Sequence, residues 1–81
     1  GHLMFTFTIK STIDARDHSD NISEGDTLYD GVLSNADAED REIFATERQA
    51  IDFGDAVLCG IDGGRAFNAA RDTATVTARE V

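Results

Sequence analysis

The amino-acid sequence predicts an α+β fold, in which one main helix packs against one face of a small antiparallel sheet. Three patterns support this class. Apolar and polar residues alternate with a period of two near the start of the chain and again near its end, as in half-buried strands. Between these regions, over about 47–61, apolar residues recur every three or four positions, as on one face of a helix. We expect four to five strands in the order β-β-(β)-α-β-β, the strand in parentheses being optional.

The first half of the chain is predicted to hold two or three strands. Met4–Ile13 alternates Phe and Ile with Thr and Lys, which is typical of a strand. Residues 14–27 are polar and predict a loop. Residues 28–33 predict a second strand or a bent ribbon, because a hairpin-type Asp-Gly dipeptide interrupts a short apolar stretch. Residues 34–40 could open a helix, but we favour an acidic turn, followed by a short strand at 41–45.

The helix has the clearest local signal. Residues 46–49 match a capping box, in which the Thr46 hydroxyl accepts from the amide of Gln49. Glycine inside a helix costs about 1 kcal/mol relative to alanine, so Gly54 on the apolar face indicates close packing against a sheet. Glycines at 60 and 63–64 would end the helix. Residues 65–70 and 74–81 then predict a closing hairpin.

The net charge of −9 is concentrated in one segment. Between Asp14 and Glu47, eleven acidic residues stand against two arginines, whereas the rest of the chain balances to zero. Clustered like charges repel one another and lower stability, so this concentration indicates a surface with a function. We predict that the partner-binding residues are the acids of this segment: Asp14, Asp17, Asp20, Glu24, Asp26, Asp30, Asp37, Glu39, Asp40 and Glu42.

No catalytic, metal or cofactor site is predicted. Residues 20–26 offer oxygen ligands and a glycine but lack the ligand spacing of an EF-hand, so we expect a solvated loop. The glycines at 60–64 follow a helix, whereas those of a phosphate-binding loop precede one. Cys59 lies near a helix C-terminus, which disfavours the thiolate, and His18 has no nucleophile beside it in the sequence. We therefore expect a protein that is not an enzyme and binds no cofactor.

The length predicts one domain. Residues 1–3 have the character of a tag remnant or a disordered start, so the domain is expected over residues 4–81. A domain of this size buries only about 60% of its unfolded surface, so a partner or a dimer interface would add stability. A single cysteine excludes an internal disulfide and favours a reducing, cytoplasmic location. No apolar run is long enough for a membrane span.

In size, acidity and lack of a catalytic motif, the chain resembles the small phage-encoded inhibitors of host defence, the anti-CRISPR and anti-restriction proteins, some of which are nucleic-acid mimics. The resemblance is to a class and gives no residue a role. It implies a binding module that occupies the basic, nucleic-acid-binding surface of a partner protein. Direct nucleic-acid binding is disfavoured because the net charge repels phosphate. The alternative is a structural or regulatory domain, as in a halophile, that homodimerises through the sheet face left uncovered by the helix.

Overall fold

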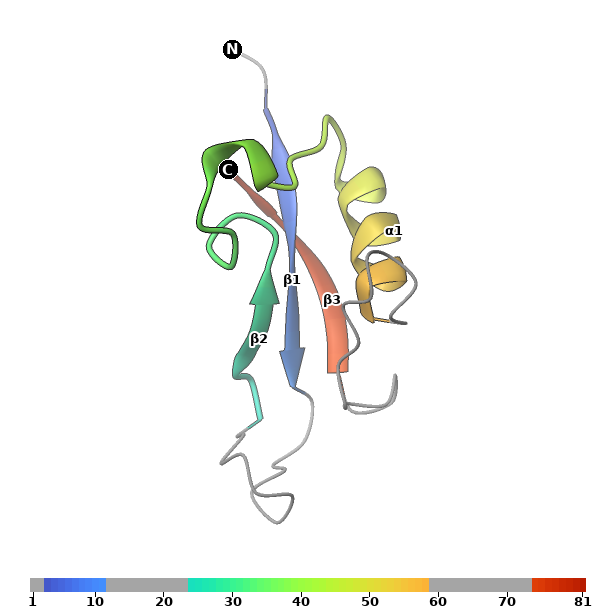
Figure 1. Cartoon of the computed structure of the whole chain (residues 1–81). Helices are drawn as coiled ribbons and strands as arrows, with labels where there is room; N and C mark the ends of the chain where they lie inside the picture. The colour runs from blue at the N-terminus through green and yellow to red at the C-terminus, as the bar shows by residue number, and fades with distance from the viewer. Residues whose placement is uncertain (1–2, 12–23, 59–73) are drawn as a thin grey trace.

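The computed structural model describes residues 3–11, 24–58 and 74–81, and within these ranges the α+β class is confirmed. Among the described elements, two strands are followed by two helices and a third strand, and the last strand ends beside the start of the first (Figure 1). In chain order the elements are β1 (Phe5–Ser11), β2 (Thr27–Asp30), the 3-10 helix η2 (Ala38–Asp40), α1 (Glu47–Leu58) and β3 (Ala74–Glu80).

β1 is the central strand of the described sheet, with β2 on one side and β3 on the other. Both pairings are antiparallel, and β1 pairs with β3 over the full length of the two strands. The pairing with β2 is shorter: Ile9 lies opposite Tyr29, and an irregularity follows between Ile9 and Lys10. Because β1 has a neighbour on each side and a helix above it, its inward residues Phe7 and Ile9 have no exposed surface.

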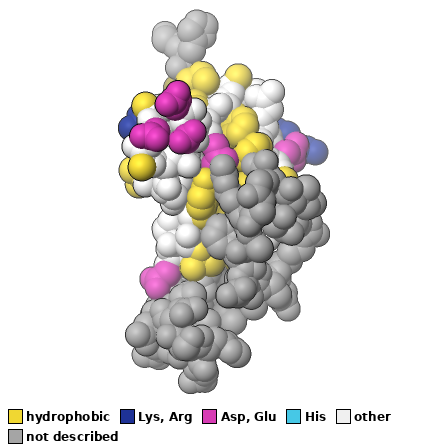
Figure 2. All heavy atoms as spheres, viewed as in Figure 1, with side chains coloured by type: hydrophobic (Ala, Val, Ile, Leu, Met, Phe, Trp, Pro, Cys, Tyr) yellow, Lys and Arg dark blue, Asp and Glu magenta, His cyan; other side chains and the backbone are white. Residues whose placement is uncertain are grey.

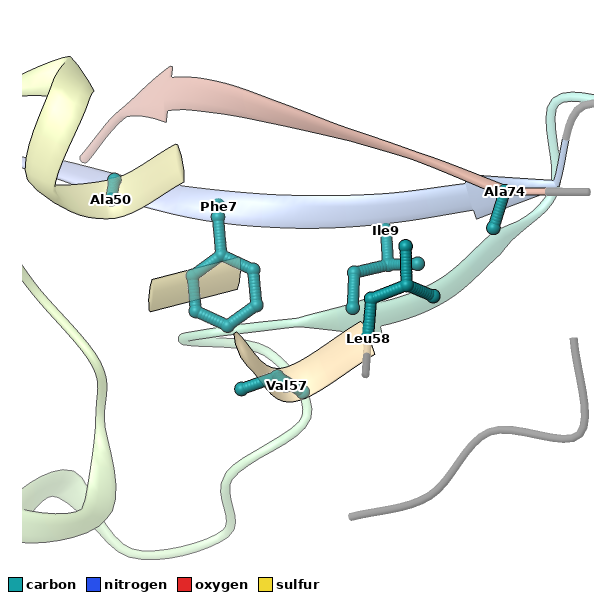
Figure 3. Packing of buried hydrophobic residues seen from close by; sticks show 6 residues of the cluster. All are labelled: Phe7, Ile9, Ala50, Val57, Leu58 and Ala74. Atoms are coloured by element: carbon teal, nitrogen blue, oxygen red, sulfur yellow. The ribbon is translucent and has the colours of Figure 1, made fainter. Parts of the chain in front are cut away.

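The hydrophobic core lies between the sheet and α1, which packs across β1 and β3 (Figures 1 and 3). Phe7 is at its centre, and its ring lies 5.6 Å from that of Tyr29 and 5.8 Å from that of Phe53, measured between centroids. Full burial of a side chain of this kind contributes about 1.5–3 kcal/mol. The buried apolar residues are Phe7, Ile9, Ala50, Val57, Leu58 and Ala74.

Gly54 is the point of closest approach between α1 and the sheet, as its position on the apolar helix face predicts. A Cβ atom at this position would lie 2.5 Å from Cγ1 of Val76 and 2.8 Å from Cδ2 of Phe7. Both distances are shorter than van der Waals contact, so the glycine lets the helix lie closer to the sheet than a side chain would allow.

The predicted start of the helix is confirmed. α1 begins at Glu47, and the backbone amide of Gln49 donates to Oγ1 of Thr46 over 3.1 Å. This bond satisfies one of the amides that the first turn leaves without a helical partner. The helix is described as far as Leu58, and the predicted final turn at 59–61 lies outside the described residues.

Two strand predictions differ from the structure in extent. The ribbon predicted at 28–33 ends at Asp30, where the chain turns away from the sheet. The strand predicted at 41–45 is reduced to one bridge between Phe44 and Phe5, because the residues before Phe44 close a loop and do not extend the ladder. The strand predicted at 65–70 lies outside the described residues.

Replacing Gly54 with alanine is expected to lower the free energy of unfolding. Overpacking of a core costs about 1–3 kcal/mol, and the gain in helix propensity, about 1 kcal/mol, offsets only part of it. Urea denaturation of Gly54→Ala should therefore show a lower midpoint than the wild type. Asp55→Ala, at an exposed position of the same helix, is the control and should not lose stability. Increased stability of Gly54→Ala would contradict the close packing.

Candidate functional site

The candidate site is a loop, residues 31–42, that leaves the edge of the sheet after β2 and returns to the same edge. At its start, the amide of Gly31 donates to the carbonyl of Phe7 over 3.0 Å. At its end, the amide of Glu42 donates to the carbonyl of Gly31 over 2.8 Å, and Phe44 then exchanges two backbone bonds with Phe5. The two ends are therefore joined, which defines a compact loop of the Ω type. We call residues 31–42 the acidic loop.

The neck of the acidic loop is packed against β1. The Thr6 hydroxyl donates to the carbonyl of Glu42 over 2.6 Å, and Thr6 is fully buried. A Cβ atom at Gly31 would collide with the Thr6 hydroxyl and would lie 3.1 Å from the carbonyl oxygen of Glu42. Glycine is therefore required at this position by space, and the neck has no room for any side chain.

An ion pair fixes the first turn of the acidic loop to the far side of the sheet. Asp30, only 3% exposed, accepts two hydrogen bonds from Arg79 of β3, one from Nε over 2.8 Å and one from Nη2 over 3.0 Å. Oδ1 of the same carboxylate also accepts from the amides of Val32, over 2.9 Å, and Leu33, over 2.8 Å. One side chain thus links the loop to a strand 49 residues away in the sequence.

The Asp30–Arg79 pair spans β1 on the face opposite α1. Arg79 lies opposite Thr6 and Asp30 lies opposite Thr8, and residues opposite one another share a face of the sheet. Phe7, between the two threonines, points to the helix, so the pair crosses the other face. From the sequence, we expect the sheet face that the helix leaves uncovered to carry threonine and arginine side chains that contact solvent or a partner. In the structure Thr6 and Thr8 are buried, whereas Thr75 and Thr77 are exposed.

The carboxylate of Asp30 stays ionised in this setting. Burial alone would raise its pKa, but the hydrogen bonds from Arg79 and from the amides of Leu33 and Val32 together hold the pKa below its ordinary value. The same pair raises the pKa of Arg79. The charge on Asp30 is therefore neutralised inside the domain and does not contribute an exposed negative group to the surface.

A second polar cluster braces the return of the loop. Tyr29 donates its hydroxyl hydrogen to Oε1 of the buried Glu42. Nδ2 of Asn35 donates to the carbonyl of Gly31 over 2.7 Å and lies 3.3 Å from the Tyr29 hydroxyl oxygen. Since Tyr29 also packs on Phe7, this cluster couples the loop to the core.

The structure divides the predicted partner-binding residues into separate groups. Asp37, Glu39 and Asp40 are exposed in the middle of the acidic loop, and Figure 2 shows acidic side chains gathered over this segment. Glu24 and Asp26 are also exposed, but at the opposite end of β2, where the backbone carbonyl of Asp26 accepts from the amide of Ser11. The three acids Asp14, Asp17 and Asp20 lie outside the described residues.

Asp30 and Glu42, two of the predicted partner-binding residues, are buried, with 3% and 9% exposure. They therefore do not lie among the exposed acids of the segment, and their contact with a partner stays a prediction. Each accepts hydrogen bonds that hold the loop, so their role in the described structure is internal. One local signal indicates the internal role of Asp30: an Asp at the start of a turn often accepts hydrogen bonds from the amides two and three residues ahead.

The described residues contain no cluster of side chains typical of a metal site. No group of three or more His, Cys, Asp or Glu residues among them could hold a metal ion. His18 and Cys59 lie outside the described ranges. Among the described residues, no helix is long and apolar enough to cross a membrane.

No protein-family model, curated protein or solved structure matches the chain.

Replacing Asp30 with asparagine is expected to destabilise the protein at neutral pH by about 1–3 kcal/mol, because Arg79 loses its charged partner. The folded-state pKa of Asp30 is lowered, so its contribution is present above the ordinary pKa of an aspartate, about 4. It is lost as the pH falls through the lower folded-state pKa. The difference in unfolding free energy between wild type and Asp30→Asn should therefore narrow below about pH 4.

Urea denaturation across this pH range tests the prediction, with Asp55→Asn as the matched control at an exposed carboxylate. The control should differ little from the wild type at any pH. An Asp30→Asn protein as stable as the wild type at pH 7 would show that the ion pair does not hold the loop.

Proposed function

We propose that this chain is a non-enzymatic binding module whose acidic loop engages a basic surface of a partner protein. One observation carries the proposal: three exposed carboxylates, Asp37, Glu39 and Asp40, lie within four consecutive positions on a loop whose base is fixed by hydrogen bonds. The side chain of Asp37 does not cap η2, and η2 itself contains no buried residue, so the three carboxylates face solvent.

Electrostatics favours a cationic partner for this loop. Carboxylates that are close together repel one another, and lysine or arginine side chains of a partner would relieve that repulsion on binding. A loop whose backbone is already held also loses less entropy on association than a loop that must first fold. The expected consequences are fast association and an affinity that weakens as salt screens the charges.

The partner class that fits best is a nucleic-acid-binding protein. Such proteins offer basic channels matched to phosphates, and a protein that displays carboxylates can occupy the same channel. Phage-encoded inhibitors of host defence include proteins that act in this way, and this chain of 81 residues with a net charge of −9 resembles them in size and acidity. Direct binding of nucleic acid is not part of the proposal, because a net charge of −9 repels phosphate.

The alternative of a homodimer formed through the sheet face opposite α1 has less support. That face is crossed by the Asp30–Arg79 ion pair and carries exposed threonines on β3. Stable dimer interfaces have a more apolar centre than this. A dimer that persists or tightens at high salt would nevertheless support the alternative, because apolar association is not screened.

Reversing the three loop charges tests the proposal. The domain, immobilised on resin, is incubated with bacterial lysate at low salt, and proteins released at moderate salt are identified and purified. The variant D37K/E39K/D40K is expected to bind the captured protein at least about tenfold more weakly. Duplex DNA added in excess should displace the wild-type domain from that protein, since both would occupy one basic surface.

The matched control is E47K/D52K/D55K, which changes the net charge equally at exposed positions of α1. It should retain most of the affinity. Equal losses in the two variants would mean that only the overall charge matters, and no loss in D37K/E39K/D40K would rule out the acidic loop as the binding surface.

A further inference from the structure

The turn that opens the acidic loop contains an Asp-Gly dipeptide, Asp30–Gly31. In a flexible chain this dipeptide rearranges, because glycine has no side chain to hinder its backbone nitrogen. The glycine nitrogen attacks the carboxyl carbon Cγ of the aspartic acid. A nitrogen–carbon bond forms, the hydroxyl of the acid leaves with the amide proton as water, and a succinimide results. Water then opens the ring at either carbonyl carbon, which gives aspartate or isoaspartate.

The peptide group that would react is held at both of its polar ends. The amide of Gly31 donates to the carbonyl of Phe7 over 3.0 Å, and the carbonyl of Asp30 accepts from the amide of Ser34 over 3.0 Å. Gly31 itself is buried. Its nitrogen can approach Cγ of Asp30 only if the hydrogen bond to Phe7 breaks and the peptide group rotates, and breaking a buried hydrogen bond is unfavourable.

The carboxyl group that would react is also held. Oδ2 of Asp30 accepts from Nε of Arg79, and Oδ1 accepts from Nη2 of Arg79 and from the amides of Val32 and Leu33. Burial alone would raise the pKa of Asp30, but these hydrogen bonds keep the pKa below its ordinary value. The group therefore stays ionised, whereas loss of water requires the protonated acid.

We propose that Asp30–Gly31 is a site of isoaspartate formation that the closed acidic loop protects and that opening of the loop exposes. The inference does not depend on the proposed function, because it concerns the turn and not the exposed carboxylates. The loop must open for the reaction to occur, so the rate in the folded chain equals the rate in a flexible chain multiplied by the fraction of molecules with an open loop.

The product does not fit the neck of the loop. Isoaspartate carries the main chain through its side chain, which adds one methylene group before Gly31 and leaves the free carboxylate one carbon closer to the backbone. Even a Cβ atom at Gly31 would collide with the Thr6 hydroxyl, so the neck has no room for an additional main-chain atom. The displaced carboxylate also loses Arg79 and the turn amides. The modification thus releases the loop irreversibly.

The folded protein and a synthetic peptide with the sequence of residues 17–41 are incubated in the same neutral buffer for several weeks. Trypsin cleaves after Arg16 and Arg41, so it releases the same peptide from the protein. Chromatography and electron-transfer fragmentation then give the amount of isoaspartate at position 30. The folded protein is expected to form isoaspartate at least about tenfold more slowly than the peptide.

Arg79→Gln should form isoaspartate about tenfold faster than the folded wild type, because the carboxyl group loses its charged partner. The matched control is Arg48→Gln, which removes an exposed arginine paired with Asp52 and should leave the rate unchanged. Thr6→Val keeps the Asp30–Arg79 pair but removes the hydroxyl that binds the neck, and a several-fold increase is expected. Circular dichroism checks that each variant is folded, and Thr6→Val carries the test if Arg79→Gln does not fold.

Three results would overturn the proposal. The first is isoaspartate formation in the folded wild type at the rate of the peptide, and the second is a rate unchanged in the folded variants Arg79→Gln and Thr6→Val. The third concerns the isolated protein with isoaspartate at position 30. Its amides at Val32 and Leu33 should lose their protection from hydrogen exchange while β1 keeps its own, and full protection of both would show that the loop accommodates the product.

Discussion

The arrangement of the acidic loop depends on the hydrogen bonds that the buried carboxylate of Asp30 accepts. It joins Arg79, on one side of the sheet, to the two backbone amides that form the first turn of the loop on the other. Opening this turn would leave a buried charge without its partners, which is strongly unfavourable. The glycine that follows Asp30 completes the neck, because the space beside it is filled by Thr6 and by the carbonyl of Glu42.

This internal use of acidic residues explains why charge along the chain differs from charge on the surface. The acidic segment is continuous in the sequence, but its described part is divided by the fold. Asp30 and Glu42 are drawn inside, and Glu24 and Asp26 lie at the far end of β2 from the exposed carboxylates of the loop. What is left together is a short group of three exposed acids, Asp37, Glu39 and Asp40.

The sequence predicts those elements whose signals are local. Alternation indicates β1 and β3, the capping box marks the start of α1, and a glycine on the apolar helix face predicts the close packing at Gly54. The Asp30–Arg79 pair joins residues 49 positions apart, and no local pattern indicates which arginine an aspartate will meet. The Asp-Gly dipeptide is typical of a hairpin, but here the Asp30 side chain caps a turn and Gly31 lies in the narrow neck of the loop. The residues that surround Gly31 there, Thr6 and Glu42, are distant in the sequence, so no local pattern predicts this role.

The central claim is that the acidic loop is held in a defined conformation by its neck, so that its three exposed carboxylates are presented together. Amide hydrogen exchange followed by NMR tests it most directly. The account predicts that the amides of Val32, Leu33 and Glu42 exchange at rates close to those of β1, since each donates to a group anchored in the sheet. Exchange of these three amides at the rate of an unstructured peptide, while β1 remains protected, would contradict it.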